Sequence, residues 1–350
     1  MRNIITDLCA TRVTYLHARR ASRAAQRNVM FLNFAVVAVG IATLVWSADL
    51  FIQGAASLAR RFGMSPLLIG MTIVSLGTSA PEILVSATAA ASGAGELAVG
   101  NAFGSNIANI GLVLGLTLII SPILVGRTTA FTDLPLLLMV VVLCGWLLKD
   151  GILSAVDASI LLAILVFYLI RISRHLRRPS INDDPSEIQE LTLSRAIVAF
   201  ILGLAILIGS SRLLVWASVN IAEALGVSEL VIGLTIVALG TSLPELAAAM
   251  VSALKGHADI AIGAVVGSNM FNLLIVLALP GFFSPLLLSI PDLQRDLGAV
   301  FITTAALAAF TWLGWRKDQD HAPLGRVAGC LFLSAYVFYC LWLYYDIQKV

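Results

Sequence analysis

The sequence predicts an all-α polytopic membrane protein with about ten transmembrane helices, arranged as two inverted five-helix repeats. The 350-residue chain is 59% hydrophobic and 12% charged, with a mean hydropathy of +0.96, whereas soluble domains carry about 25% charged residues. At about 20 residues per span, this length fits roughly ten helices. The chain also contains an internal duplication with an offset of 163 residues, which divides it into two similar halves.

The duplication is clearest in two motifs that occur once in each half. The run IGMTIVSLGTSAPE at residues 69–82 recurs as IGLTIVALGTSLPE at residues 232–245, with 11 of 14 positions identical. The run GNAFGSNIAN at residues 100–109 recurs as GAVVGSNMFN at residues 263–272. Because five is an odd number, two similar five-span halves must cross the membrane in opposite directions, as in many secondary transporters.

A basic leader, residues 1–29, precedes the first repeat. It carries six arginines against one acid, Asp7, a composition that resembles an organelle transit peptide. The simpler alternative is that translation begins at Met30, where the first span also begins. On either interpretation we expect the leader not to belong to the mature folded protein.

Apolar runs divide the rest of the chain into a first repeat at residues 30–170, a polar linker at 171–194 and a second repeat at 195–350. The linker is too short to form a folded domain of its own. With boundaries good to about 2–4 residues, we expect spans at 30–58, 66–91, 97–120, 131–148, 152–172, 196–224, 230–254, 260–279, 297–315 and 324–345.

Loop charges predict the orientation of these spans. Loops on the linker's side carry twelve Lys and Arg residues, whereas the opposite side, without the leader, carries only Lys149, Arg295 and Lys349. The positive-inside rule therefore places the linker in the cytoplasm and both mature termini outside. The net charge of +2 gives no indication of nucleic-acid binding.

The first motif predicts a broken helix that holds a carboxylate. Pro81 has no N–H, so the carbonyl of Gly77 loses its helical partner, and such a carbonyl persists at membrane depth only where protein, water or an ion satisfies it. Glu82 and its repeat equivalent Glu245 are the acids nearest the middle of their spans. Two buried carboxylates cannot both ionise cheaply unless a cation lies between them, so the pair predicts a functional site.

The side chains that accompany these carboxylates are hard oxygen donors. They are Thr78, Ser79, Thr241, Ser242 and the amides of Asn109 and Asn272. No thiol or imidazole joins them, because the four cysteines and four histidines lie elsewhere. Oxygen donors favour group I and II cations such as Na⁺ and Ca²⁺ over zinc or copper.

The second motif adds polar residues that share a helix face. Asn101, Ser105 and Asn109 are four residues apart, as are Ser268 and Asn272 in the second copy. The alternative is that these side chains only hold helices together, as the neighbouring GxxxG pairs do. The asparagine directly after each serine lies off this face, and its position is equally compatible with either role.

A GTSxPE run followed by a GSNxxN-type run, present in both halves, resembles the cation/calcium exchanger family of sodium/calcium antiporters, and particularly its compact bacterial members. The resemblance covers the chain from about Met30 to the C-terminus. It implies a ten-helix antiporter of the bacterial inner membrane with four central cation sites. Transported Ca²⁺ and Na⁺ would be its substrates, and it would need no cofactor. The sequence does not predict an oligomeric state.

The resemblance also implies roles for single residues. Glu82 and Glu245 match the shared carboxylates, and Thr78 and Thr241 match residues that offer oxygens to calcium. The flanking sodium sites would use the same threonines together with Ser79, Ser105, Ser242, Ser268 and the backbone carbonyls of Ser75 and Ala238.

The remaining motif positions are the two amides. Asn109 matches an asparagine of the family, whereas Asn272 stands where some members carry Asp. The site therefore has two carboxylates rather than three, which leaves potassium dependence and stoichiometry open.

Three other functions remain to be weighed against Na⁺/Ca²⁺ exchange. Exchange of H⁺ or another cation for Ca²⁺ is a close alternative, because protons also neutralise carboxylates. An intramembrane hydrolase with Ser79 or Ser242 as nucleophile would need a base within hydrogen-bond reach, and no His or Lys lies at midspan. We therefore do not expect an enzyme. A passive channel is the third alternative.

Overall fold

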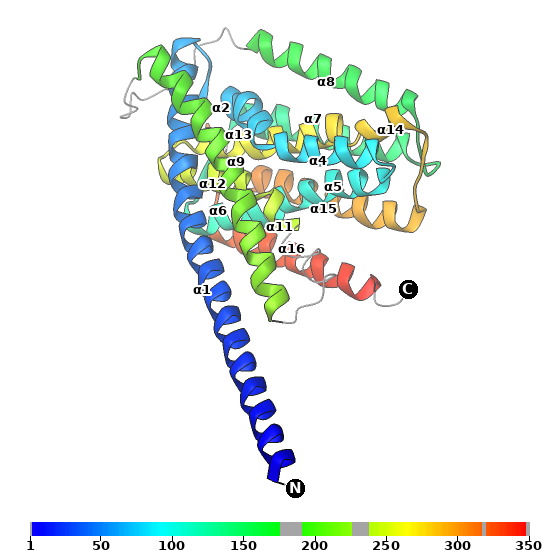
Figure 1. Cartoon of the computed structure of the whole chain (residues 1–350). Coiled ribbons are helices and arrows are strands. Elements are labelled where there is room, and N and C mark those ends of the chain that lie inside the picture. The colour runs from blue at the N-terminus through cyan, green and yellow to red at the C-terminus, as the bar shows by residue number, and fades with distance from the viewer. Residues whose placement is uncertain (1, 176–190, 226–237, 317–319, 348–350) are drawn as a thin grey trace.

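The computed structural model describes residues 2–175, 191–225, 238–316 and 320–347, and these parts of the chain form a bundle of membrane-length helices (Figure 1). Eight of the described helices are long and apolar enough to cross a membrane. A bent pair, Pro66–Thr78 with Ala80–Ala91, provides a ninth candidate span. The predicted span at 230–254 lies partly outside the described residues, and its described part is the apolar helix Leu243–Leu254. The all-α polytopic fold class is confirmed.

The first half of the chain follows the predicted order of spans, with short π-helical segments (η) inside several of them. Its elements are α1 (Arg2–Arg61), α2 (Pro66–Ile69), η1 (Gly70–Val74), α3 (Ser75–Thr78), α4 (Ala80–Ala91), α5 (Gly95–Ala108), η2 (Asn109–Leu114), α6 (Gly115–Ile120), β1 (Ile123–Gly126), η3 (Thr129–Asp133), α7 (Leu134–Leu147), β2 (Ile152–Leu153) and α8 (Ala155–His175).

The second half repeats this pattern after the linker. Its described elements are α9 (Leu193–Ala224), α11 (Ala238–Thr241), α12 (Leu243–Leu254), α13 (Ala258–Phe271), η5 (Asn272–Val276), α14 (Leu279–Phe283), β3 (Leu286–Leu287), α15 (Ile290–Leu313), β4 (His321–Leu324) and α16 (Arg326–Ile347).

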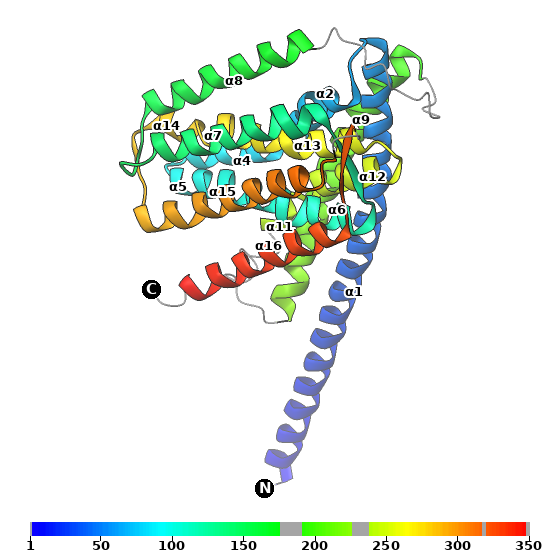
Figure 2. The same cartoon turned by 180° about the vertical axis from the view of Figure 1, so that it is seen from behind.

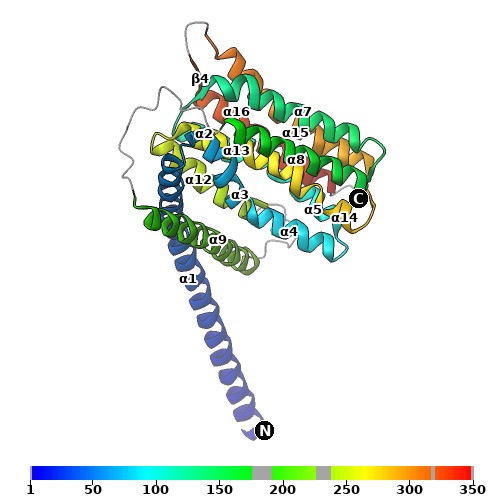
Figure 3. The ribbon, with the colours of Figure 1, turned by 90° about the horizontal axis from the view of Figure 1, so that it is seen from above.

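Two long helices, α1 and α9, lie side by side on one face of the bundle and run across the direction of most other helices (Figures 1 and 3). Glycines permit their close approach. A Cβ added at Gly54 would lie 2.4 Å from the backbone nitrogen of Phe200, and one at Gly203 would lie 2.5 Å from that of Phe51. The offset of 163 carries the apolar span Met30–Arg61 onto Leu193–Ala224, so the two helices are repeat equivalents.

The basic leader continues α1 beyond this apolar span. The helix has 60 residues, about 90 Å at 1.5 Å per residue, which is about three times the thickness of a hydrocarbon core. Its N-terminal part projects away from the other helices (Figures 1 and 2). The expectation that residues 1–29 are absent from the mature protein stays a prediction.

The helices that carry the second motif lie at the centre of the bundle. In the span Ala258–Phe283, 94% of the most apolar window is buried, against 72% in Gly95–Ile120 and 22% in Arg326–Tyr345. The motif helices α5 and α13 are therefore surrounded by protein, and α16 faces outward. Two small antiparallel sheets, β1 with β4 and β2 with β3, join loops of one repeat to loops of the other.

Candidate cation site

The first helix break lies where the sequence predicts it. Helix α3 ends at Thr78, α4 begins at Ala80, and the two parts of the span meet at an angle of 45°. Ser79 lies between them, and its backbone angles, φ −81° and ψ 2°, are not those of an α-helix. Pro81 occupies the first turn of α4, where a missing N–H costs no hydrogen bond. The break places Glu82 in the same first turn, with its side chain buried.

The second break has the same local form. Helix α11 ends at Thr241, Ser242 has φ −90° and ψ 4°, and α12 begins at Leu243. Glu245 lies in the first turn of α12 and is buried. Both carboxylates thus stand at the N-terminus of a half-helix, the end at which unpaired N–H groups stabilise negative charge. The run that precedes this break, residues 226–237, lies outside the described part of the chain.

The two breaks meet through a serine of the first repeat. The hydroxyl of Ser79 lies 2.9 Å from the hydroxyl of Ser268 on α13, and 3.2 Å from Oε1 of Glu245, to which it donates. Three of the predicted site residues, separated by as many as 189 positions in the chain, are therefore in direct contact.

The carboxylates are not fully satisfied by the side chains around them. Oε2 of Glu82, Oε2 of Glu245 and the hydroxyl of Ser242 are all buried without a hydrogen-bond partner among the described residues. A buried ionised pair of this kind is expensive unless a counter-charge accompanies it. Within the described parts of the chain, no group of three or more His, Cys, Asp or Glu side chains is placed to hold a metal, so a cation would rely on two carboxylates and neutral oxygens.

The amides at the ends of α5 and α13 behave differently from one another. Asn109 donates from Nδ2 to Oδ1 of Asn269, 3.1 Å away, whereas its own Oδ1 has no partner in the described chain. Asn272 is fully buried, and neither amide atom has a partner among the described residues. Both predicted amides thus retain a free carbonyl oxygen. Each stands where an α-helix gives way to a π-helical segment, η2 or η5.

Of the two asparagines directly after the motif serines, Asn269 connects helices of the two repeats through its side chain. Asn269 on α13 accepts from Asn109 and also lies 3.5 Å, through Nδ2, from the carbonyl oxygen of Asn106 on α5. Asn106 itself donates to the carbonyl of Ala102 within its own helix. Of the two roles that the sequence left open, these contacts favour packing between the repeats for Asn269, whereas Asn106 keeps a buried Oδ1 without a partner among the described residues.

Asn101 supports the first break in a way that the sequence did not predict. Its Nδ2 donates to the backbone carbonyl of Glu82, 3.2 Å away, and to the hydroxyl of Ser86, 3.0 Å away. It therefore ties the first turn of α4 to α5. Its position on the polar face of α5 was visible in the sequence, but Ser86 was not singled out, because it lies in a run of small residues beyond the motif.

The remaining predicted residues lie on the elements that form the breaks and on the motif helices. The Thr78 hydroxyl donates within its own span to the carbonyls of Val74 and Ser75, at 3.2 and 3.3 Å. The Ser75 carbonyl also accepts from the backbone N–H of Ser79. Ser105 is buried on α5, and Thr241 is half-buried at the second break.

The second GxxxG pair brings a neighbouring helix close to the site. A Cβ at Gly263 would lie 2.6 Å from the carbonyl oxygen of Leu67, and one at Gly267 would lie 2.5 Å from that of Met71. These glycines let the span that leads to the first break pack directly on α13, as the sequence predicted. The positions equivalent to Leu67 and Met71 in the second repeat fall within residues 226–237, outside the described residues.

Comparisons with known proteins agree with this arrangement. The chain matches a family model described as sodium/calcium exchanger protein over residues 32–173 and 195–345. It is 42% identical to the putative antiporter CaxA of Alkalimonas amylolytica over 310 residues, which are 87% of this chain and 96% of CaxA. The inner membrane protein YrbG of Escherichia coli (strain K12) is 38% identical over 324 residues, covering 90% and 98% of the two chains. A structure of the sodium-calcium exchanger NCX_Mj, soaked with Na⁺ and Ca²⁺, matches with a TM-score of 0.74 and 33% identity over 88% of this chain and 97% of NCX_Mj.

Proposed function

The chain belongs to the sodium/calcium exchanger protein family and is an integral membrane antiporter of cations and Ca²⁺, and from this premise we propose that Na⁺ is the counter-ion and that the two helix breaks form the transport site. The proposal assigns ion binding to Glu82 and Glu245, with oxygens from Thr78, Ser79, Ser105, Asn109, Thr241, Ser242, Ser268 and Asn272. No enzymatic activity and no resident cofactor are part of it.

The observation that carries the proposal is the contact of Ser79 with Glu245 and Ser268 across the two repeats. It places both breaks at one point, where two buried carboxylates have a combined charge of −2 when ionised. One Ca²⁺ balances that charge, and so do two monovalent cations. Competition between the two kinds of cation for one pair of carboxylates couples the release of one to the binding of the other.

Hard oxygen donors support Ca²⁺ and Na⁺ as the ions. Ca²⁺ takes 6–8 oxygen ligands in flexible geometry, and carboxylates, hydroxyls and amide carbonyls are the groups gathered here. NCX_Mj, the structural neighbour, is described as a sodium-calcium exchanger soaked with both ions. Protons are the competing counter-ion, because protonation neutralises the same carboxylate oxygens that lack partners.

We also propose the orientation and location of the protein. The excess of Lys and Arg on the linker's side supports a cytoplasmic linker and mature termini on the outside. YrbG, which is 38% identical, is named an inner membrane protein, and the same bacterial membrane is proposed for this chain.

Calcium uptake into reconstituted liposomes tests the proposed counter-ion. Vesicles loaded with Na⁺ should take up Ca²⁺ when diluted into Na⁺-free buffer, and should not do so when Na⁺ is equal on both sides. The double variant Glu82→Gln/Glu245→Gln is the control for leakage. Uptake that follows an imposed pH gradient without Na⁺ would assign H⁺ instead, and uptake without any counter-gradient would indicate a channel.

A further inference from the structure

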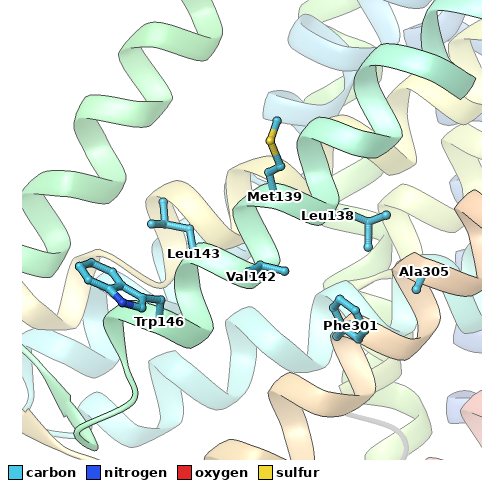
Figure 4. A pocket seen from close by; sticks show the side chains of 7 residues that line it. All are labelled: Leu138, Met139, Val142, Leu143, Trp146, Phe301 and Ala305. Atoms are coloured by element: carbon cyan, nitrogen blue, oxygen red, sulfur yellow. The ribbon is translucent and has the colours of Figure 1, made fainter.

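An apolar groove lies on the outside of the bundle between α7 and α15, away from the cation site. Its volume is about 520 Å³, and it is lined almost wholly by hydrocarbon. Side chains of α7 form one wall and the floor, among them Leu138, Val142 and Trp146, while Phe301 and Ala305 of α15 form the other wall (Figure 4). Met139, Val142 and Trp146 each expose more than half of their surface, so protein leaves the groove open to the membrane.

The groove has the length of one membrane leaflet. From Leu138 to Trp146, α7 rises about 12 Å at 1.5 Å per residue, and half of a hydrocarbon core is about 15 Å. Trp146 lies one residue before the end of α7 at Leu147, the depth at which tryptophan is enriched at membrane interfaces. The groove therefore runs from the middle of the membrane to its surface on the side opposite the linker.

A positive charge stands at the surface end of the groove. The ammonium of Lys149 lies 5.0 Å from the centre of the Trp146 ring, so the aromatic ring holds it beside the groove. Within the described chain Lys149 forms no ion pair with a carboxylate, and its three N–H donors remain available. It is also one of only three basic residues that the predicted topology places on this side outside the leader.

The chemistry of the groove favours a lipid over a second protein chain. Its walls are hydrocarbon, and a single ammonium stands at its surface end. An extended hydrocarbon chain with an anionic head at one end matches both the apolar walls and the ammonium at the mouth.

We propose that this groove, which α7 and α15 form and which Trp146 and Lys149 border at its surface end, binds one anionic phospholipid from the leaflet opposite the linker. One acyl chain lies between Val142 and Phe301, and the phosphate contacts Lys149. The site is independent of the ion site. Lys149 gives the site its preference for an anionic head group. The small side chain of Ala305 leaves room for the acyl chain.

Native mass spectrometry of the full chain in detergent tests the proposal. Phosphatidylglycerol and phosphatidylcholine with identical acyl chains serve as probes. The unmodified protein should retain one phosphatidylglycerol with a preference of about fivefold over phosphatidylcholine, the ratio expected for about 1 kcal/mol from one basic residue near anionic lipid. Lys149→Gln should abolish the preference, and Ala305→Trp, which fills the groove, should weaken retention of both lipids.

A matched control separates this site from general attraction between charges. Arg127 stands 5.9 Å from the centre of the Phe131 ring, before the opposite end of α7, and is exposed. Arg127→Gln removes the same charge and should leave the preference intact. Equal loss in Arg127→Gln and Lys149→Gln, or an unchanged preference in Lys149→Gln, would overturn the proposal.

Thermal unfolding guards against a merely structural effect of the variants. All of them should melt as the unmodified protein does in lipid-free detergent. Added phosphatidylglycerol should raise the melting temperature of the unmodified protein and of Arg127→Gln equally, that of Lys149→Gln by less, and that of Ala305→Trp least. Val142→Trp replaces Ala305→Trp if the latter does not fold. A dimer that these groove-filling variants abolish would show a second copy as the occupant and would contradict the proposal.

Discussion

The two repeats are almost identical in their motifs but unequal in their contacts. Ser79 of the first break donates to Glu245 and contacts Ser268, whereas its equivalent, Ser242, is buried without a partner among the described residues. Asn109 donates to Asn269, whereas the equivalent amide at position 272 has no partner there on either atom. At these two pairs of positions, the side chain of the first repeat donates a hydrogen bond to the other half, and its equivalent in the second repeat has no partner among the described residues.

A second difference concerns how each break is held. Asn101 ties the backbone of Glu82 to α5, while the equivalent position in the second repeat is Ala264, whose side chain has no donor. On the other hand, α1 of the first repeat forms an ion pair through Asp49 with Lys255 at the end of α12. An inverted repeat in one conformation must treat its halves differently, because only one set of equivalent contacts is made at a time.

The largest expected effect tests whether the carboxylates are equivalent despite these differences. Glu82→Gln and Glu245→Gln should each abolish calcium transport and leave the protein folded. Removing one charge leaves a divalent ion with half of its counter-charge in a poorly solvated place, a loss of several kcal/mol, or about 10³-fold in binding. Calcium binding by isothermal titration and uptake into liposomes measure this.

Glu96→Gln is the matched control, because Glu96 is an exposed acid at the start of α5. It should transport normally. Near-normal uptake by Glu82→Gln or Glu245→Gln would remove that residue from the site and would show that the halves are unequal in charge as well as in contacts.

The serines of the two breaks should differ in the ion-free protein. Ser79→Ala removes a donor from a buried carboxylate, and a hydrogen bond to a charged group contributes about 1.5–3 kcal/mol. Ser242→Ala removes a hydroxyl that has no such contact. We therefore expect a lower melting temperature for Ser79→Ala than for Ser242→Ala in detergent without Na⁺ or Ca²⁺. Equal melting temperatures would mean that the asymmetry does not persist in solution.

The amides provide a test of ion preference. Asn272 offers a carbonyl oxygen and no charge. The negative charge of the site therefore comes from Glu82 and Glu245 alone, and one Ca²⁺ balances it. An added K⁺ would leave an uncompensated positive charge in a low-dielectric site. We expect Na⁺-driven calcium uptake that does not require K⁺, measured with the K⁺ diffusion potential clamped. Asn272→Asp should alter ion preference rather than simply destroy transport.

Asn109→Asp is the equivalent change in the first repeat, and it should differ because it also breaks the bond to Asn269. A strict requirement for K⁺ in the unmodified protein would contradict this interpretation of Asn272. The same ion preference in Asn109→Asp and Asn272→Asp would show that charge alone matters at the two positions.

The sequence was sufficient to predict the fold class and the location of both breaks. A duplicated Pro and Glu within an apolar run have strong local consequences, because a missing N–H and a buried charge constrain any structure. The pairing of Ser79 with Glu245 and of Asn109 with Asn269 could not be predicted. The two halves are alike at these positions, so only the packing of one conformation determines which member of each pair makes the contact.

The smallest expected effect concerns the part of α1 that has no counterpart in the second repeat. The span Met30–Arg61 corresponds at the repeat offset to Leu193–Ala224, which is the whole of α9. The family model begins at residue 32. Residues 2–29 precede the apolar span of α1 and the start of the family match, and they project from the bundle (Figure 1). Deleting them, so that Met30 starts the chain, should leave Na⁺-driven calcium uptake unchanged per correctly inserted molecule. Insertion is checked by protease accessibility of the linker. Reduced uptake by a correctly inserted truncated protein would show that the first repeat, unlike the second, depends on an extension of its long helix.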